Sequence, residues 1–308
     1  MARARHLAGQ VVVVTGAARG VGALVAKKLA DRGARVAVLG LEPDELAGVS
    51  ASCGPRSRWW QVDVTDESAL TDVAAKVLEA YHEIDVVVAN AGIAIGGPFL
   101  YSDARSFARV IEVNLLGSIA TARAFMPALV QSKGYLLQVA SMAALAPSPM
   151  MAAYCASKSG VEAFAHSVRA EVAHHGVQVG VAYLSWTDTD MVRGADANAA
   201  LREMRAELPF PADRTYALES TVDALARGIA RRAPRVYGQR WLPPVQLARG
   251  LLPIAARFAA RTMPEIESRW LATGAKTDPV GAGGAADTAA RAASGHGTPS
   301  AAAGSQRS

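Results

Sequence analysis

The sequence contains few of the residues that mark small secreted, metal-binding or disordered proteins. Only two of its 308 residues are cysteines, Cys53 and Cys155, and they lie far apart, outside any metal-ligand spacing. Neither a disulfide framework nor a metal site is therefore expected, and reduced thiols in a cytoplasm are the default. Charged residues make up 19% of the chain and apolar residues 51%, which is typical of a folded protein with ample material for a core.

Long hydrophobic runs are also missing. No stretch approaches the ~20 apolar residues that a membrane-spanning helix needs. The apolar run Val11–Val14 is too short for the core of an export signal and leads directly into a turn rich in glycine. These features predict a cytoplasmic protein.

The net charge of +5 is concentrated in one segment. Residues 231–270 carry eight arginines against two glutamates, a net charge of +6, so the rest of the chain is close to neutral. No helix-turn-helix, zinc-finger or RNA-binding motif accompanies these arginines, and nucleic-acid binding is not expected.

Residues 241–272 form a basic amphipathic extension in this interpretation. Four apolar residues recur there at helical spacing, with a tryptophan on either side: Leu247, Leu251, Ile254 and Phe258, flanked by Trp241 and Trp270. A basic helix with such a stripe can lie on an anionic membrane, so peripheral membrane contact through 241–270 is one hypothesis. Pro253 weakens the helix, and the alternative is an extension that packs over the substrate cleft or a second subunit.

Short apolar runs alternate with longer helical stretches along most of the chain. Six runs are predicted strands: Val11–Val14, Arg35–Leu39, Trp59–Val62, Asp85–Ala89, Tyr135–Val139 and Gln178–Tyr183. Helices are predicted over Val21–Arg32, Glu67–Tyr81, Asp103–Gln131 and Ala152–His174. Strands that are nearly continuous in apolar residues suit a parallel sheet covered on both faces. The pattern predicts a single α/β domain, a doubly wound Rossmann-type sheet in a three-layer αβα sandwich.

This domain is expected to occupy residues 1–240, with a substrate lid at about 190–214, and the extension 241–272 follows it. After that, the composition changes to Gly, Ala, Thr, Ser and Pro without hydrophobic periodicity. We therefore expect residues 273–308 to be a disordered tail.

A glycine turn joins the first predicted strand to the first helix. It reads Thr15-Gly16-Ala17-Ala18-Arg19-Gly20-Val21-Gly22. Glycines let the backbone turn tightly and approach a pyrophosphate, and the helix N-terminus then offers unpaired N–H groups to the phosphates. Ligands of doubly wound sheets bind at this carboxyl end of the strands, so the turn predicts a dinucleotide site.

The spacing Thr-Gly-x-x-x-Gly-x-Gly resembles that of the short-chain dehydrogenase/reductase family, and the similarity covers roughly residues 8–235. Asp63 resembles the aspartate that bonds the adenine ring, and Asn90-Ala91-Gly92 resembles the turn over the adenosine. The resemblance implies cofactor contacts from Thr15, Gly16, Arg19, Gly20, Val21, Gly22, Gly40, Glu42, Asp63, Val64, Asn90, Ala91, Gly92, Tyr154, Lys158, Thr187 and Thr189.

The second strand ends at Gly40, where the family's acidic residue for the ribose 2′-hydroxyl is absent. Arg19 could meet a 2′-phosphate, whereas Glu42 could reach a hydroxyl. We expect NADP rather than NAD, by a small margin.

Tyr154 and Lys158 lie four residues apart in a predicted helix, so both side chains share one face. A nearby ammonium and the positively charged nicotinamide favour phenolate, which would lower the tyrosine pKa from ~10 and make it a useful acid/base. Ser141 follows the fifth predicted strand and would bond the substrate oxygen. Asn114 resembles the family's residue that anchors a water relay to the lysine. Together the four resemble the family's catalytic tetrad, and no metal is implied.

The sequence departs from the family where Leu184-Ser185 replaces the usual Pro-Gly, although Thr189 matches the threonine that contacts the nicotinamide. Trp186 is expected to fill the space and contact substrate. An apolar pocket is expected from Met142, Leu145, Met150, Met151 and Trp186, which suits a hydrophobic carbonyl/alcohol pair.

The resemblance also implies a homodimer or homotetramer built on the helices around Phe107–Met126 and Val161–Val172. We therefore expect an NAD(P)-dependent oxidoreductase. The alternatives are a cofactor-binding sensor or scaffold without turnover, or a membrane-peripheral interaction protein.

Overall fold

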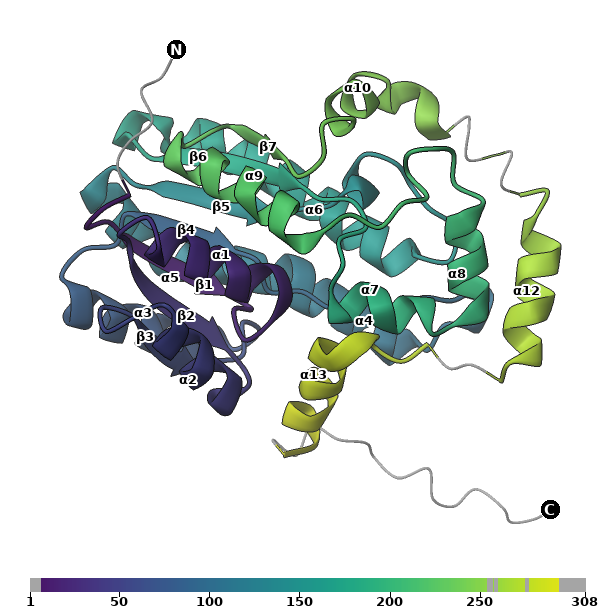
Figure 1. The fold of residues 1–308 in the computed structure, drawn as a ribbon, viewed down its shortest axis with the longest axis horizontal. Coiled ribbons are helices and arrows are strands. Elements are labelled where there is room, and N and C mark those ends of the chain that lie inside the picture. Colours follow the sequence, from purple (N-terminus) through teal and green to yellow (C-terminus); the bar gives the residue numbers. More distant parts are fainter. Residues whose placement is uncertain (1–6, 254–256, 258–259, 275–276, 294–308) are drawn as a thin grey trace, which may run out of the picture.

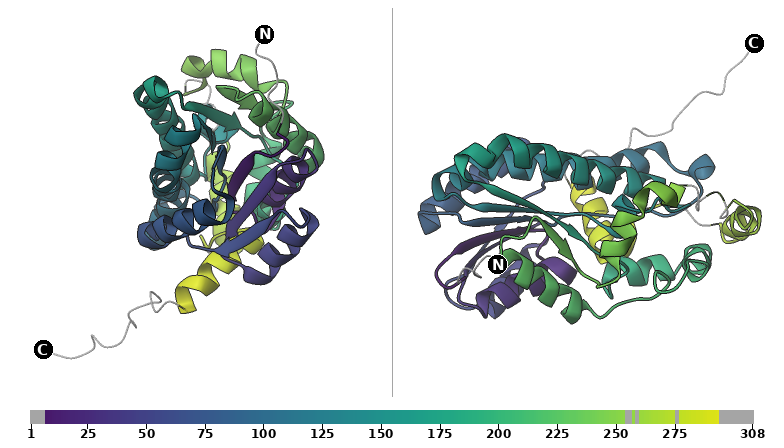
Figure 2. Two further views of the ribbon diagram at one scale, coloured as in Figure 1. Left: turned by 90° about the vertical axis from the view of Figure 1, so that its left-hand side faces the viewer. Right: turned by 90° about the horizontal axis from the view of Figure 1, so that it is seen from above.

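The computed structural model describes residues 7–253, 257, 260–274 and 277–293. Seven parallel strands form one sheet in the order β3-β2-β1-β4-β5-β6-β7. The strands are β1 Val11–Thr15, β2 Arg35–Gly40, β3 Arg58–Gln61, β4 Val86–Ala89, β5 Tyr135–Val139, β6 Gln178–Tyr183 and β7 Arg235–Tyr237. Helices cover both faces of the sheet (Figure 1, Figure 2), so the predicted doubly wound α/β sandwich is confirmed.

Alternating side chains along the strands build one core on each face of the sheet. On one face lie α1 Gly20–Ala30, α2 Pro43–Ser52 and α9 Leu218–Ala230; on the other lie α3 Glu67–Tyr81, α4 Ala104–Ile111, α5 Gly117–Ser132 and α6 Ala152–Val172. In β1, Val12 and Val14 face the first layer while Val11 and Val13 face the second, and all four are fully buried. This double burial explains why the strand is apolar at every position.

A smaller layer lies beyond the carboxyl ends of the strands. It contains α7 Asp190–Asp196, α8 Ala199–Ala206, α10 Leu242–Leu247, α12 Met263–Ala272 and α13 Gly281–Ala293. A third core joins α8 to α12 through Leu201, Met204, Ile266 and Trp270. Short 3-10 turns complete the elements at Phe99–Tyr101, Met142–Ala144, Ala173–His175 and Arg249–Leu251.

Two predicted elements differ in detail. The helix predicted over Asp103–Gln131 is divided into α4, a π-helical turn Glu112–Leu116 and α5, because the wider turn carries Asn114 into the core. The third strand is an edge strand in which only Trp60 is partly buried and the other three residues are exposed, whereas burial on both faces was expected. The run Ala104–Ser132 has the length and hydropathy of a membrane span, but 56% of its most apolar window is buried inside the fold.

The expectation of a disordered tail is wrong for part of residues 273–308. Gly281–Ala293 forms α13, and Asp287 within it is only 2% exposed. The absence of a hydrophobic period misled the prediction because this helix packs through small residues and one ion pair.

Candidate active site

The glycine turn brings the backbone of β1, α1 and the strand-β4 loop into close contact. Gly16 has a φ of +61°, and a Cβ there would lie 2.6 Å from the Cα of Ala91. A Cβ on Gly22 would lie 2.3 Å from the Gly16 carbonyl oxygen. Only glycine fits either position, so the turn is as tight as a dinucleotide cradle requires.

The N-terminus of α1 is open towards this cradle. Its first turn holds no acidic residue, and Arg19 at the N-cap makes no capping hydrogen bond with its side chain. Asn90 Nδ2 donates to the carbonyl oxygens of Thr15 and Gly16, both at 3.1 Å, and so holds the loop in place. Uncapped N–H groups beside a glycine turn fit a pyrophosphate.

A cavity of about 230 Å³ extends from this turn. Its lining brings together every predicted cofactor residue except Thr15 and Gly22, which lie in the turn behind it. At the ribose end, Arg19 donates to Glu42 at 2.7 Å, and Glu45 lies 3.6 Å from the same guanidinium. Arg19, expected to bind a 2′-phosphate, and Glu42, expected to bind a 2′-hydroxyl, therefore form an ion pair with each other at the ribose end of the cavity.

Asp63 is held in a network that the sequence did not reveal. It accepts hydrogen bonds from Thr65 N at 2.9 Å, from Thr65 Oγ1 at 2.8 Å and from the Arg109 guanidinium at 2.9 Å. Burial works to raise the pKa of this carboxyl, but the Thr65 bonds and the Arg109 charge together hold it below the usual value. Arg109 sits in an ordinary amphipathic helix, and no local signal distinguishes it.

The four predicted catalytic residues converge at the other end of the cavity. Tyr154 and Lys158 project from α6 and Ser141 follows β5, all three in the cavity lining. The Lys158 ammonium donates to the Val139 carbonyl at 2.9 Å and lies 5.8 Å from the centre of the Tyr154 ring. A Cβ placed on Gly92 would lie 3.1 Å from Asn114 Oδ1 and 3.4 Å from Lys158 Nζ, so these two polar groups border one small space.

Asn114 is fully buried in the π-helical turn. Its amide donates to the Ile93 carbonyl and to Ser157 Oγ, both at 3.0 Å, while its oxygen accepts from Ile93 N at 2.8 Å. The side chain is therefore rigid, with its oxygen beside the space that it shares with Lys158.

The pKa of Tyr154 moves in the opposite direction to the sequence expectation. Burial raises it to about 12, although a hydrogen bond from Ser141 acts to lower it. Burial also lowers the pKa of Lys158 to about 8. The Lys158 ammonium donates to a backbone carbonyl, and burial rather than the lysine charge determines the pKa of the Tyr154 phenol. In this state Tyr154 is protonated and suited to donate a proton to a carbonyl oxygen.

The departure at Leu184-Ser185 has a structural substitute for the missing proline and glycine. Ser185 N donates to Gln239 Oε1 at 2.9 Å, and Gln239 Nε2 donates to Thr221 at 3.0 Å. Gln239, only 5% exposed, follows β7 and was not predicted as a site residue. The Gln239 side chain thus holds the Ser185 backbone in place through a hydrogen bond, whereas a proline would restrict that backbone through its own ring. Ser185, Thr187 and Thr189 line the cavity beyond it.

A second cavity of about 550 Å³ meets the first at Ser141, Tyr154 and Ser185. Met142, Met151 and Trp186 line it as predicted. Leu145 and Met150 do not, because both are buried in core packing instead. The sequence missed the contributions of Trp241 and Val245, which come from the C-terminal extension, and of the loop 208–212.

The comparisons with known proteins agree with this geometry. Residues 10–200 match the family model described as short chain dehydrogenase. The chain belongs to the short-chain dehydrogenase family. It is 31% identical over 225 residues to cis-4-hydroxycyclohexanecarboxylate dehydrogenase of Sinomonas cyclohexanicum, covering 71% of this chain and 88% of that one.

Two further relatives support the same assignment. The 3-oxoacyl-[acyl-carrier-protein] reductase of Escherichia coli is 28% identical over 75% of this chain and 94% of its own. A crystal structure of a metagenomic short-chain oxidoreductase in complex with NADP superposes with a TM-score of 0.55 and 35% identity, covering 58% of this chain and 83% of that one.

This short-chain dehydrogenase is an NAD(P)-dependent oxidoreductase that transfers hydride between the nicotinamide and a carbonyl/alcohol pair. The bound nucleotide supplies the hydride donor or acceptor. A sensor or scaffold role without turnover is not favoured.

Proposed function

We propose that this enzyme acts on a hydrophobic ketone or secondary alcohol. The supporting observation is the 550 Å³ cavity, lined mainly by apolar side chains, that opens at Ser141 and Tyr154. Tyr154 would exchange the proton with the substrate oxygen, Ser141 would hold that oxygen from its other side, and Asn114 with Lys158 would support the proton relay. A sugar would leave many hydroxyl groups without partners in such a pocket.

Relatives add independent support for this substrate class. One is named for the oxidation of a hydroxycyclohexane ring and another for the reduction of a 3-oxoacyl chain. Both names describe a carbonyl/secondary alcohol pair on a hydrocarbon framework, which is what the apolar cavity here would accommodate.

We expect activity to increase with the apolar size of a ketone substrate. Each buried methylene contributes about 0.8 kcal/mol, so kcat/KM should rise about fourfold per carbon in a series of 2-alkanones until the cavity is filled. The series is run with NADPH and with NADH in parallel. Polyol or sugar substrates turned over faster than every alkanone would contradict the proposal.

NADPH is proposed as the better cofactor in that assay. Arg19 lies beside the ribose end of the cavity, and its ion pair with Glu42 would be replaced by a bidentate contact with the 2′-phosphate. A higher kcat/KM with NADH would assign the site to the Glu42 carboxylate instead.

We also propose a homodimer or homotetramer formed through α4, α5 and α6. Phe107, Met126, Phe164 and Val168 are only half-buried on this outer layer, and Leu116 is 52% exposed. Covering these side chains would remove apolar surface from water. Light scattering from the full chain measures the assembly.

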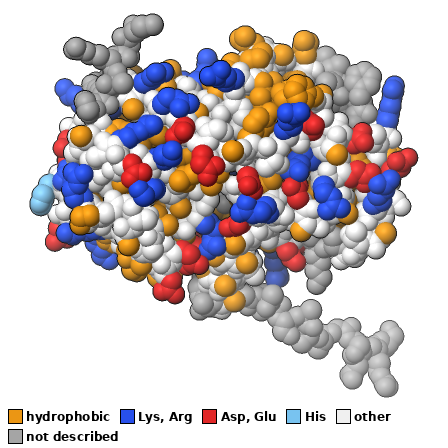
Figure 3. All heavy atoms as spheres, viewed as in Figure 1, with side chains coloured by type: hydrophobic (Ala, Val, Ile, Leu, Met, Phe, Trp, Pro, Cys, Tyr) orange, Lys and Arg blue, Asp and Glu red, His pale blue; other side chains and the backbone are white. Residues whose placement is uncertain are grey.

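A fourth proposal is that the enzyme works in the cytoplasm at the surface of an anionic membrane. Both cysteines are free, as in a reducing compartment. Leu247 is 90% exposed and Leu251 68% exposed, and hydrophobic side chains gather over α10 in Figure 3. Phe210, 72% exposed, lies on the rim of the same substrate cavity. Of the predicted stripe, Ile254 and Phe258 lie outside the described residues.

Replacing Leu247 and Leu251 together by aspartate is expected to lower binding to phosphatidylglycerol-containing vesicles at least about tenfold, since each buried leucine contributes about 1.5–3 kcal/mol. Flotation of the full chain measures this binding. Leu100→Asp, at a leucine in another segment whose exposure of 76% lies between those of Leu247 and Leu251, is the control. Equal flotation of the double variant and the parent would remove the membrane hypothesis.

A further inference from the structure

The C-terminal strap, residues 277–293, contributes part of the lining of the nucleotide cavity, and its helix α13 lies beside α7 in Figure 1. Val280, Gly283 and Asp287 line that cavity together with the glycine turn and Asp63. Their spacing of three and four residues places Gly283 and Asp287 on one face of α13, directed at the cavity. A segment from the far end of the chain therefore forms one wall of the cofactor site.

Backbone contacts fix the N-terminal end of the strap. Asp103 N donates to Thr277 Oγ1 at 2.8 Å, and Val280 N donates to the Ala94 carbonyl at 2.8 Å. Gly281, with a φ of +76°, lies against α7: a Cβ on it would be 2.6 Å from the Asp190 carbonyl oxygen. The strap is thus packed on the first helix of the substrate lid.

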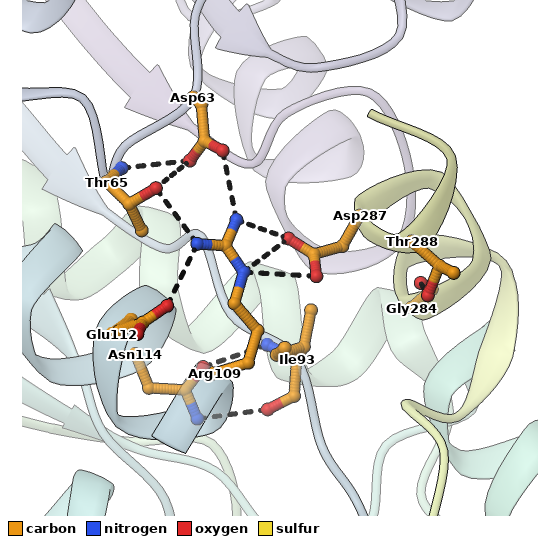
Figure 4. A network of polar contacts seen from close by, with 9 residues as sticks. All are labelled: Asp63, Thr65, Ile93, Arg109, Glu112, Asn114, Gly284, Asp287 and Thr288. Atoms are coloured by element: carbon orange, nitrogen blue, oxygen red, sulfur yellow. Dashed lines mark hydrogen bonds and ion pairs between the residues drawn. The ribbon is translucent and has the colours of Figure 1, made fainter. Parts of the chain in front are cut away.

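A buried ion cluster fixes the other end (Figure 4). Asp287 accepts from Arg109 Nε at 3.0 Å and from its terminal nitrogen at 2.6 Å. The same guanidinium bonds Asp63 at 2.9 Å, Thr65 at 3.0 Å and Glu112 at 3.3 Å. Every donor direction of Arg109 is therefore used, and the Asp287 side chain is only 3% exposed.

Besides this cluster, α13 is held by its N-terminal end, where Gly281 packs on α7, and the helix itself is weak. Three of its first four residues are glycines, and each glycine costs a helix about 1 kcal/mol relative to alanine. An isolated helix of this length is marginal in water. Its buried residues are small, so hydrophobic burial contributes little. Docking of the strap therefore depends on the Asp287–Arg109 pair and on the packing of Gly281 against α7 rather than on a hydrophobic core.

The docked strap disfavours the nucleotide in two ways. With the strap docked, the cavity has a volume of only about 230 Å³, whereas sites for drug-sized ligands, which are smaller than a dinucleotide, span about 300–1,000 Å³. The strap also adds the Asp287 carboxylate to a site for a polyanion and engages Arg109, the cation beside Asp63. Both effects act against binding, one by volume and one by charge.

We propose that the C-terminal strap is an internal competitor of NAD(P), docked by Asp287 on Arg109 and displaced when the nucleotide binds. This proposal rests on nucleotide binding at the glycine turn and goes beyond the assigned reaction. Because coupling between two binding events is reciprocal, anything that releases the strap tightens nucleotide binding, and the nucleotide releases the strap by the same factor.

Two variants of the full chain test this coupling. Asp287→Asn removes the charge while keeping the shape, and Gly281→Ala introduces a Cβ against the Asp190 carbonyl. Each should lower the Kd for NADPH at least about fivefold in a fluorescence titration, within the usual range of allosteric coupling. Asp278→Asn makes the same chemical change at an exposed carboxylate of the strap and should leave Kd unchanged.

Hydrogen exchange gives a readout independent of affinity. Adding NADP to the parent protein should accelerate amide exchange in residues 281–293, because the displaced helix loses its support. Slower exchange there would show that the strap closes over the bound nucleotide, and it would overturn the competition. Equal Kd values for parent and variants would also overturn it. Absence of binding in every form would overturn the nucleotide site as well, which separates the two failures.

Discussion

Tyr154→Phe is expected to lower turnover about 10²–10⁴-fold while leaving the Kd for the nucleotide nearly unchanged. The substitution removes only the phenol oxygen, which lies where the nucleotide and substrate cavities meet. The ring is retained, so packing of α6 against the sheet is kept. Since burial raises the pKa of the phenol to about 12, Tyr154 is protonated and can donate a proton, whereas phenylalanine has no proton to donate.

Single-turnover and titration measurements separate the two expectations. Tyr101→Phe, the same change at an exposed tyrosine, should leave turnover intact and serves as the control. Undiminished turnover of Tyr154→Phe would overturn the assignment of Tyr154 as the proton donor. A large rise in the nucleotide Kd would show instead that the hydroxyl holds the cofactor.

The strands and the glycine turn could be predicted because their determinants are local. A run such as Val11–Val14 is apolar at every position because both sheet faces are covered, and that pattern is visible without the fold. The glycine positions could also be predicted, since Gly16 has a positive φ and a Cβ on Gly22 would meet the Gly16 carbonyl, both within one strand-turn-helix unit. Tyr154 and Lys158 share a helix face for the same local reason.

Arg109, Gln239 and Asp287 could not be predicted because their roles are made by distant parts of the chain. Arg109 joins Asp63 to a helix 178 residues further on. Gln239 supports the backbone of Ser185 from 54 residues away. Neither interaction leaves a periodic or spacing signal. The direction of the Tyr154 pKa was missed for a related reason: burial depends on the assembled core, whereas the spacing to Lys158 is local.

Because the ammonium of Lys158 is buried, we expect this catalytic residue to lower the free energy of unfolding of the parent protein. Burial lowers its pKa from 10.5 to about 8, so the unfolded chain binds more protons between these values. Stability of the parent therefore rises with pH across that window, and below pH 8 the full cost of burying the charge is present. The shift corresponds to about 3 kcal/mol.

Lys158→Met should accordingly be more stable at pH 7 by about 2 kcal/mol, after about 1 kcal/mol is lost because the Val139 carbonyl no longer has its donor. For a domain of this size, that raises Tm by about 4–8 °C, while hydride transfer is lost with the relay. Thermal unfolding at pH 7 and pH 10 measures the difference, which should shrink at the higher pH. Lys76→Met, at an exposed lysine, controls for the added apolar side chain.

A variant less stable than the parent at pH 7, or a difference that does not change with pH, would show that Lys158 is buried without cost. The ammonium would then be stabilised by its surroundings, and the proton relay would have to operate with a lysine of ordinary pKa.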